Sequence, residues 1–387
     1  MKYTAIILAA VIAIVQAAPL VNNGGKAIPD SYIVVLKDGN TADSFQAKFD
    51  DIARRQNGRG RTPSIHRKYG QFPGFAATVN QAALKEILAA DEVAYVEQDA
   101  IVTLQGSQSS PPSWGLSRVS ERNLDLTQPY LYNDAAGSGV TAYIVDTGVY
   151  AAHSDFGGRA TFGANFVTGS ANTDENGHGT HVSGTIGGTK YGVAKKVSIV
   201  GVKVLDASGS GSTSGVVAGM DWVAQRAVAG KSVVNMSLGG GFSQAINDAA
   251  GRLFSKNIPL IVAAGNSATT DACTGSPSGA ANTFTVAASD KTDTVASFSS
   301  YGTCVEIFAP GVGITSAWIG STTATNTISG TSMATPHVVG VAALYLSFNS
   351  LPTAQSVFDK LISTATTGKI KGSLKNSPNR LVFNGAV

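Results

Sequence analysis

Charge is scarce in this chain. Charged side chains make up 14% of its 387 residues, and the formal net charge is only +3. So small a balance, without a basic stripe along the sequence, argues against nucleic acid as a partner. The low charge is accompanied by 44 glycines, a composition typical of a compact, loop-rich catalytic domain rather than of a disordered chain. The length predicts two or three folded units.

Long apolar runs are also absent, apart from one at the start of the chain. Residues 1–17 combine a lysine at position 2, an apolar core over residues 5–15 and a small-residue exit, which is the pattern of a secretory signal peptide. The apolar core is shorter than a membrane-spanning helix requires, and no later segment is long enough. We therefore expect a secreted, extracellular protein with no membrane partner. A short membrane anchor is the alternative interpretation.

Cysteine occurs only twice, as Cys273 and Cys304. Disulfides persist in secreted proteins, so these two residues are expected to pair with each other if the chain is exported. Two free, buried thiols are the alternative.

Residues 18–106 differ in composition from the rest, because they hold nearly all of the clustered charge. Residues 31–37, 74–79 and 93–97 have the pattern of strands, and residues 41–53 and 81–90 that of helices. The βαββαβ-like order indicates a small split-βαβ domain.

A linker is expected where this piece ends. The apolar residues 101–104 can lie extended in a cleft, and residues 105–112 are rich in glutamine, serine and proline. Such a segment is typical of an exposed, cleavable connection. An ordinary interdomain linker is the alternative.

From residue 107 onward, strand-like and helical patterns alternate. Strands are expected over residues 140–145, 197–205, 233–238, 258–264 and 283–287, and helices over residues 178–186, 213–229, 244–255, 332–348 and 353–364. Continuous valine and isoleucine runs that alternate with helices imply a mainly parallel sheet covered on both faces. We therefore expect an α/β fold for residues 107–387.

Three segments of this part carry reactive residues. Asp146 follows the apolar run in VTAYIVDTGV, His178 lies between two glycines in NGHGTHVSG, and Ser332 follows GT at the start of a helical segment. A serine hydroxyl is a weak nucleophile that needs a base beside it. His178 would take its proton, and Asp146 would orient His178. The structural alternatives are a strand-end aspartate, a capping histidine and an N-cap serine. If the helix begins at Ser332, Pro336 lies in its first turn, where proline is tolerated.

The chain order Asp, His, Ser in these motifs resembles that of the subtilisin-like serine proteases, most closely the proteinase K-like branch. The resemblance implies a three-layer α/β/α subtilase fold for residues 107–387. It also implies that residues 18–106 are an inhibitory propeptide of ferredoxin-like fold, which chaperones its own protease. In this family WGL lies near the N-terminus of the mature enzyme, and aligning residues 114–116 with it places propeptide cleavage near Gly106 and Ser107.

The same resemblance assigns catalytic roles. Asp146, His178 and Ser332 would form the triad, and the Asn266 amide with the Ser332 N–H would form the oxyanion hole. The implied function is a secreted serine endopeptidase that forms an acyl-enzyme and requires no cofactor for catalysis. Its partners would be protein and peptide substrates and its own propeptide, and the enzyme would be a monomer. Some relatives carry a disulfide at places matching Cys273 and Cys304.

Substrate-binding residues follow from the same alignment. Two backbone segments match those that hold an extended peptide between them, and two further residues match the wall of the P1 pocket; the residues are Gly209, Ser210, Gly211, Ser237, Leu238, Gly239, Ala263 and Gly265. Glycines permit close backbone approach, and strand addition binds peptides independently of their sequence. These stretches carry no charge, so tolerance of apolar and aromatic P1 residues is expected. Either glycine stretch could instead be a simple turn.

A structural calcium ion is left open by the sequence. Ala281, Thr283 and Glu306 match a calcium site of proteinase K-like enzymes in which an aspartate normally ligates the ion. Calcium accepts carboxylate and carbonyl oxygens flexibly, so the longer glutamate does not exclude binding. A second, terminal site has Arg122 and Ser363 at its matching positions and is expected to be lost.

Two other classes of function deserve comparison. A lipase or esterase also uses Ser, His and an acid, but it would need the serine first in the chain and a G-x-S-x-G turn, whose last glycine GTSMA lacks. A catalytically inactive binding protein on the same scaffold is disfavoured because Asp146, His178, Asn266 and Ser332 are all intact. Hydrolysis of denatured casein would separate these possibilities.

Overall fold

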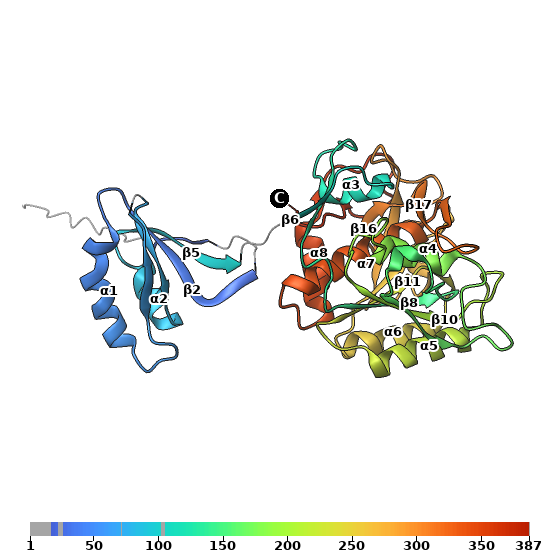
Figure 1. The fold of residues 1–387 in the computed structure, drawn as a ribbon, viewed down its shortest axis with the longest axis horizontal. Helices are drawn as coiled ribbons and strands as arrows, with labels where there is room; N and C mark the ends of the chain where they lie inside the picture. The colour runs from blue at the N-terminus through green and yellow to red at the C-terminus, as the bar shows by residue number, and fades with distance from the viewer. Residues whose placement is uncertain (1–16, 22–25, 71, 102–104, 387) are drawn as a thin grey trace, which may run out of the picture. The chain divides into compact units, whose positions relative to one another are not determined.

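The computed structural model describes residues 17–21, 26–70, 72–101 and 105–386. Apart from residue 17, the predicted signal peptide lies outside the described residues. The chain divides into two compact units, residues 1–102 and residues 103–387 (Figure 1). Within the described residues, none of the helices combines the length and the hydropathy that a membrane span requires.

The first unit is a five-stranded sheet with two helices. Its strand order is β1-β5-β2-β4-β3, and every pair is antiparallel except β1 with β5. The elements are β1 (Leu20–Val21), β2 (Lys26–Leu36), α1 (Ala42–Gln56), β3 (Ser64–Lys68), β4 (Gly74–Thr78), α2 (Gln81–Leu88) and β5 (Val93–Ile101). The predicted βαββαβ order is confirmed, and the arrangement of β2 to β5 is that of a ferredoxin-like fold.

Helix α1 shows why this unit folds as its sequence predicts. Thr41 and Ser44 form a capping box, in which the Thr41 side chain accepts from the Ser44 N–H at 3.1 Å and Ser44 Oγ accepts from the Thr41 N–H at 3.0 Å. Phe45 and Phe49 lie four residues apart and therefore on one face. Both rings pack against Phe75 of β4, at centroid distances of 5.7 and 5.6 Å.

The second unit is built on a nine-stranded sheet. Its strand order is β19-β20-β16-β15-β13-β11-β8-β10-β9, and all neighbours are parallel except β19 with β20. The strands are β8 (Thr141–Asp146), β9 (Ala160–Asn165), β10 (Ser198–Lys203), β11 (Ser232–Met236), β13 (Leu260–Ala263), β15 (Phe284–Ser289), β16 (Val305–Pro310), β19 (Thr366–Thr367) and β20 (Arg380–Leu381).

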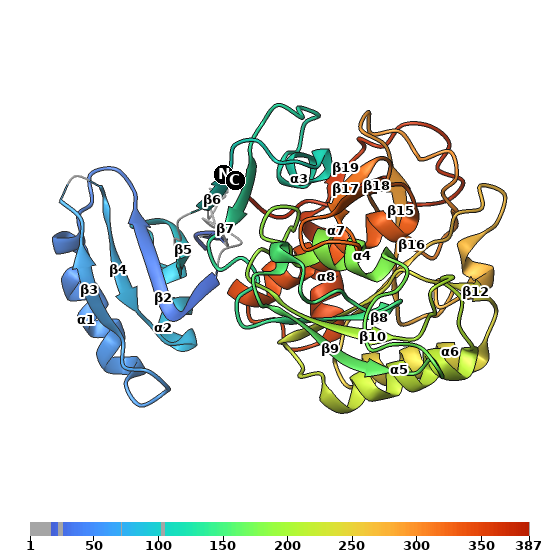
Figure 2. The ribbon, with the colours of Figure 1, turned by 45° about the vertical axis from the view of Figure 1, so that its right-hand side comes forward.

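Helices cover both faces of this sheet (Figure 2). They are α3 (Trp114–Ser120), α4 (His178–Gly187), α5 (Thr213–Arg226), α6 (Gln244–Ser255), α7 (Thr331–Phe348) and α8 (Ala354–Thr364). Neighbouring strand residues point to opposite faces. Val233 of β11 joins the core formed with α4, α7 and α8, whereas Val234 joins the core formed with α5 and α6. The predicted three-layer α/β/α fold is confirmed.

Part of the predicted linker is ordered as a strand. Strand β6 (Gln105–Gln108) pairs antiparallel with β7 (Tyr130–Asn133). A Cβ on Gly106 would lie 2.5 Å from a carbon of the Tyr132 ring, so the close approach of this strand requires glycine. The expected cleavage position, Gly106 and Ser107, therefore lies within a paired strand of the second unit.

Two further short strand pairs and one disulfide complete the unit. Strand β12 (Gly240–Gly241) pairs with β14 (Gly275–Ser276), and β17 (Ile314–Ala317) pairs with β18 (Thr325–Ile328). Cys273 and Cys304 form a disulfide, as predicted, across a sequence separation of 31 residues.

Candidate active site

Asp146 and His178 meet where a strand end faces a helix start. Asp146 is the last residue of β8, and His178 is the first residue of α4. His178 Nδ1 lies 2.8 Å from Asp146 Oδ1. Because a carboxylate accepts, Nδ1 carries the proton and Nε2 has a free lone pair. The Asp146 side chain is fully buried, while that of His178 is 25% exposed, so Nε2 can reach a substrate.

The backbone at the start of α4 places the imidazole. Gly177 precedes the helix with a φ of 108°, in the left-handed region that favours glycine. A Cβ there would also lie 2.5 Å from carbon atoms of the Trp318 ring. The residue before His178 is therefore restricted to glycine by both conformation and space.

The charged and hydrogen-bonding groups around His178 favour its protonated form. Burial lowers the pKa of His178, but the charge of Asp146 and the hydrogen bond to it raise the pKa, with a further contribution from the charge of Asp174. The raising effects prevail, and the pKa of His178 lies above its ordinary value of 6.5. An imidazolium at this position is stabilised.

Ser332 is the second residue of α7, one position further into the helix than predicted. It is therefore not an N-cap, and Pro336 lies in the second turn rather than the first. Ser332 Oγ donates to the Ser237 carbonyl oxygen at 2.9 Å. Within the described residues, no hydrogen bond joins Ser332 Oγ to His178 in this conformation.

Proline at position 336 explains an unusual contact of Ser332. Proline has no N–H, so the helical bond to the carbonyl four residues earlier, that of Ser332, cannot form. That carbonyl instead accepts from Ser237 Oγ at 3.0 Å. Ser237 Oγ is itself held by Asn235 Nδ2 at 3.0 Å. The backbone of Ser332, the candidate nucleophile, is thus fixed by β11 and the residue that follows it.

Asn266 is held by a residue that sequence reasoning missed. Its Oδ1 accepts from the Thr331 N–H at 2.8 Å and from Thr331 Oγ1 at 2.9 Å. Thr331 Oγ1 in turn accepts from the Gly265 N–H at 3.1 Å. Among the described residues, none accepts from Asn266 Nδ2, which is left to donate elsewhere. The position of Thr331, directly before the candidate nucleophile, was the available signal.

The predicted substrate residues line two pockets that share Leu238 and Gly239. One pocket, of about 580 Å³, is lined by His178, by the segment containing Gly209, Ser210 and Gly211, and by Ser237. The other, of about 280 Å³, is lined by Ala263, Gly265, Asn266 and Ser332. The structure therefore places all eight predicted substrate residues around two adjoining pockets.

One charged residue was missed in the smaller pocket. Asp271 is among its lining residues, although the stretches considered in the sequence carry no charge. Asp271 Oδ1 accepts from the Cys273 N–H at 2.9 Å. Asp271 and the two cysteine sulfurs are close enough together for a metal site, but the sulfurs are bonded to each other and cannot act as thiolate ligands.

The predicted calcium ligands have another partner. Glu306 Oε2 lies 3.6 Å from Arg380 Nη1, and burial raises the pKa of Glu306 although Arg380 lowers it. The Thr283 hydroxyl donates to the carbonyl oxygens of Ala280 and Pro277, while Ala281 is exposed. Calcium takes six to eight oxygens, which can be carboxylates, backbone carbonyls or waters. The one carboxylate of this set faces a guanidinium, whose positive charge would compete with the ion.

The family follows from comparison with known proteins. The "Subtilase family" profile matches residues 137–380, and "Peptidase inhibitor I9" matches residues 31–105. "Subtilisin-like protease 2" of Pseudogymnoascus destructans is 45% identical, over 92% of this chain and 90% of its own length. The "Cuticle-degrading serine protease" of Arthrobotrys oligospora is 44% identical, over 94% and 93%. A cold-adapted subtilisin-like serine proteinase of known structure is 49% identical, with a TM-score of 0.68, over 71% of this chain and 99% of that one.

These matches define a peptide-hydrolysing serine protease with an inhibitor-type domain at its N-terminal side. The chain belongs to the subtilase family.

Proposed function

We propose that this chain is a secreted serine endopeptidase in which Asp146, His178 and Ser332 form the catalytic triad. The observation that carries the proposal is the 2.8 Å contact between His178 Nδ1 and Asp146 Oδ1, at the same cleft that Ser332 lines. It supports a base whose tautomer is fixed and whose Nε2 can accept a proton.

The first half of the reaction would form an acyl-enzyme. Rotation of the Ser332 side chain away from the Ser237 carbonyl brings Oγ to His178 Nε2, which takes its proton as Oγ attacks the substrate carbonyl carbon. The resulting oxyanion is held by Asn266 Nδ2 and the Ser332 N–H. His178 then gives the proton to the leaving amine, and the peptide C–N bond breaks.

The second half repeats these steps with water. His178 takes a proton from the water molecule, whose oxygen attacks the acyl carbon. The proton then returns to Ser332 Oγ as the ester bond breaks, which frees the acid product. Each residue regains its starting protonation state, so catalysis needs no cofactor.

The substrates would be proteins and peptides bound as extended strands. Support comes from Gly209–Gly211 and Ser237–Gly239, which line the larger pocket; backbone groups of such segments can pair with a substrate backbone. The smaller pocket is bounded by Ala263 and Gly265, and the Asp271 carboxylate in its lining is already engaged by the Cys273 N–H; we therefore keep apolar and aromatic P1 side chains as the proposed preference. We include no calcium ion in this proposal, because Glu306 faces Arg380.

The chain would be made as a zymogen that processes itself. The inhibitor-type match over residues 31–105 supports residues 18–106 as an intramolecular inhibitor, with residues 1–17 removed on secretion. Cleavage near Gly106 and Ser107 would release residues 107–387 as a monomeric enzyme.

Replacing the nucleophile tests the proposal. Ser332→Ala should abolish hydrolysis of denatured casein and leave the precursor uncut after signal removal, because one serine serves both reactions. Ser350→Ala is the matched control, since Ser350 is an exposed serine that lines neither of the two pockets. Mass spectrometry of casein fragments would report the P1 residues. Normal release of a mature N-terminus near Ser107 from purified Ser332→Ala protein would rule out self-processing.

A further inference from the structure

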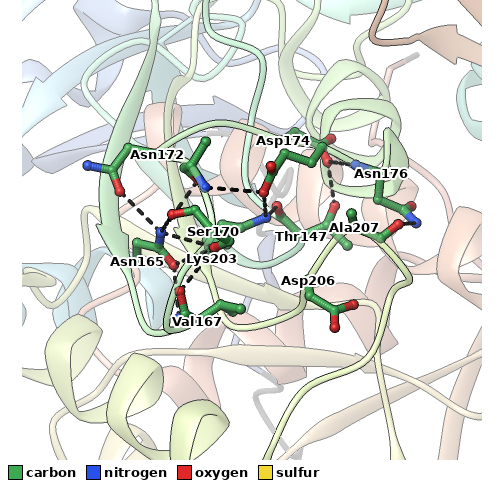
Figure 3. A network of polar contacts seen from close by, with 12 residues as sticks. Thr147, Asn165, Val167, Ser170, Asn172, Asp174, Asn176, Lys203, Asp206 and Ala207 are labelled. Atoms are coloured by element: carbon green, nitrogen blue, oxygen red, sulfur yellow. Dashed lines mark hydrogen bonds and ion pairs between the residues drawn. The ribbon is translucent and has the colours of Figure 1, made fainter.

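A second buried carboxylate lies beside the triad without belonging to it. Asp174, in the loop before α4, is only 4% exposed. Its Oδ1 accepts from Thr147 Oγ1 at 2.8 Å and from the N–H groups of Asn176 and Gly177 at 3.0 and 2.9 Å. Its Oδ2 accepts from the N–H and the hydroxyl of Thr180, at 2.8 and 2.6 Å. Five donors therefore converge on one side chain, as Figure 3 shows in part.

Asp174 replaces the cap that helix α4 lacks. The N-cap residue is Gly177, which has no side chain to accept from the first turn. The first N–H groups of a helix have no intrahelical partner and carry partial positive charge. The Asp174 carboxylate satisfies such groups at Gly177 and Thr180, and thereby anchors the turn that begins with His178.

Thr147 connects this anchor to the strand that carries Asp146. Its hydroxyl donates to Asp174 and accepts from the Gly179 N–H at 2.9 Å. Its own N–H donates to Asp146 Oδ1 at 2.7 Å. One residue thus touches the triad carboxylate, the buried Asp174 and the first turn of α4.

The backbone carbonyl of Thr147 is also held in place, by a buried lysine. Lys203, fully buried at the end of β10, donates from Nζ to the Thr147 carbonyl oxygen at 2.8 Å and lies 3.5 Å from Glu175 Oε2. Lys203 is also the register partner of Asp146 in the sheet. A Cβ on Gly179 would collide with the Gly148 carbonyl oxygen. The chain after β8 and the first turn of α4 are therefore in direct backbone contact, which restricts movement of one relative to the other.

We propose that Thr147 and Asp174 are positioning residues, which lock the end of β8 to the first turn of α4 and so set the distance between Asp146 and His178. The proposal rests on the proposed triad. Asp146 and His178 are 32 residues apart and sit on different elements, so their contact depends on how those elements are joined. The pair Thr147 and Asp174 is one side-chain link between the two, beside the bond from the Tyr150 N–H to Thr180 Oγ1 at 2.9 Å.

The first test compares Thr147→Val with Thr147→Ser in the full-length chain after self-processing. Valine keeps the shape but loses the hydroxyl, whereas serine keeps the hydroxyl. Thr147→Val should lower kcat on a neutral peptide by about 10- to 100-fold, the size expected for a small misplacement of catalytic groups. Thr147 also lines the larger pocket, so Thr147→Ser is the reference, and it should stay within about twofold of wild type in both kcat and KM. Rates are divided by the concentration of active sites from burst titration, so that misfolded protein does not count.

The second test asks whether the two residues act as one unit. Asp174→Asn replaces one carboxylate oxygen, which accepts hydrogen bonds, with an NH₂ group, which donates them. That group would face backbone N–H donors, so the bonds are lost and kcat should fall as in Thr147→Val. The double variant should be no slower than the slower single variant, because either change already opens the link. The proton NMR signal of His178 Nδ1–H should shift or disappear in both variants but stay in Thr147→Ser.

The outcomes separate this proposal from the proposed function. Loss of all activity in Ser332→Ala, together with a kcat for Thr147→Val within about twofold of wild type, overturns the positioning role alone. Equal losses in Thr147→Val and Thr147→Ser, or additive losses in the double variant, overturn it too. If Thr147→Val does not fold, Thr147→Ala is compared with Thr147→Ser by the same criteria. Wild-type protein that cleaves no peptide overturns the proposed function itself.

Discussion

Ser237 and Ser332 exchange two hydrogen bonds across 95 residues of sequence. Ser332 Oγ donates to the Ser237 carbonyl oxygen, and Ser237 Oγ donates to the Ser332 carbonyl oxygen. The second bond satisfies an oxygen that Pro336 leaves without its helical partner. The contact ties the candidate nucleophile to the segment that is proposed to bind substrate.

Ser237→Ala is therefore expected to impair both stability and turnover. It leaves the Ser332 carbonyl oxygen without its protein donor, which costs about 1–3 kcal/mol for a buried group. Turnover should fall because the backbone of the nucleophile is less well fixed. Urea unfolding of the enzyme inactivated with a sulfonyl fluoride, which prevents self-digestion, measures the first effect. Ser350→Ala, at an exposed serine, is the control, and equal unfolding midpoints for the two variants would contradict the prediction.

The pH dependence follows from the raised pKa of His178. Because His178 must be neutral to act as base, kcat/KM should rise with pH to a midpoint above 6.5. The sign for stability is opposite: a raised folded-state pKa stabilises the protein below the unfolded-state pKa, and this contribution is lost as pH rises through the folded-state pKa. A kcat/KM profile between pH 5 and 10 checks the midpoint, and a midpoint at or below the ordinary histidine value of about 6.5 would contradict the prediction.

Asp146→Asn tests the cause of that shift. Removing the charge should lower the midpoint and reduce kcat by about 10⁴, as for the corresponding change in a chymotrypsin-type triad, with binding largely intact. Measurements of kcat and KM on one neutral peptide for both proteins decide the matter. If Asp146→Asn keeps more than about a tenth of wild-type turnover, far above that precedent, Asp146 is not the orienting acid.

Asn266 and Thr331 should act together in stabilising the oxyanion. Asn266→Ala is expected to lower kcat by about 10²–10³ with little change in KM, as for a comparable donor in subtilisin. Thr331→Val removes the hydroxyl that holds Asn266 Oδ1 but leaves the N–H bond, so its effect should be smaller. Thr331→Ser is the control and should behave like wild type. A larger loss in Thr331→Val than in Asn266→Ala would show that Thr331 acts in another way.

The disulfide should stabilise the catalytic unit without contributing to chemistry. Its loop of 31 residues gives about 3–4 kcal/mol on the chain-entropy model. The double variant Cys273→Ser/Cys304→Ser should unfold at lower urea, and reductant should shift wild type but not the variant. Active-site-normalised kcat should be preserved. An unchanged unfolding midpoint would show that the bond constrains little.

Calcium should have little effect on wild-type stability, because Arg380 already faces Glu306. The thermal midpoint of the sulfonyl fluoride-inactivated enzyme should be the same with calcium and with chelator. Arg380→Met removes the competing cation and offers the site to calcium, so only this variant should gain from the ion. A clear rise for wild type would show that calcium binds despite the arginine.

The sequence by itself determined the order of elements and the identity of the reactive groups. A helix or a strand repeats its side-chain directions at a fixed period, so its buried residues form a pattern that can be read in the sequence. The valine-rich run of β11 and the four-residue spacing of Phe45 and Phe49 are examples. Strands β3, β9 and β16 were missed, the last because Glu306 interrupts its apolar run. The start of α7 was placed one residue late, since its N-cap, Gly330, offers no side-chain signal.

Only the tertiary structure decided which of these groups touch. The contacts of Ser237 with Ser332, of Asn266 with Thr331 and of Thr147 with Asp174 span 95, 65 and 27 residues. Each depends on the strand order of the sheet and on the loops that bring strand ends to helix starts. A periodic pattern records which face of an element is buried, but it carries no information about the distant element that covers that face.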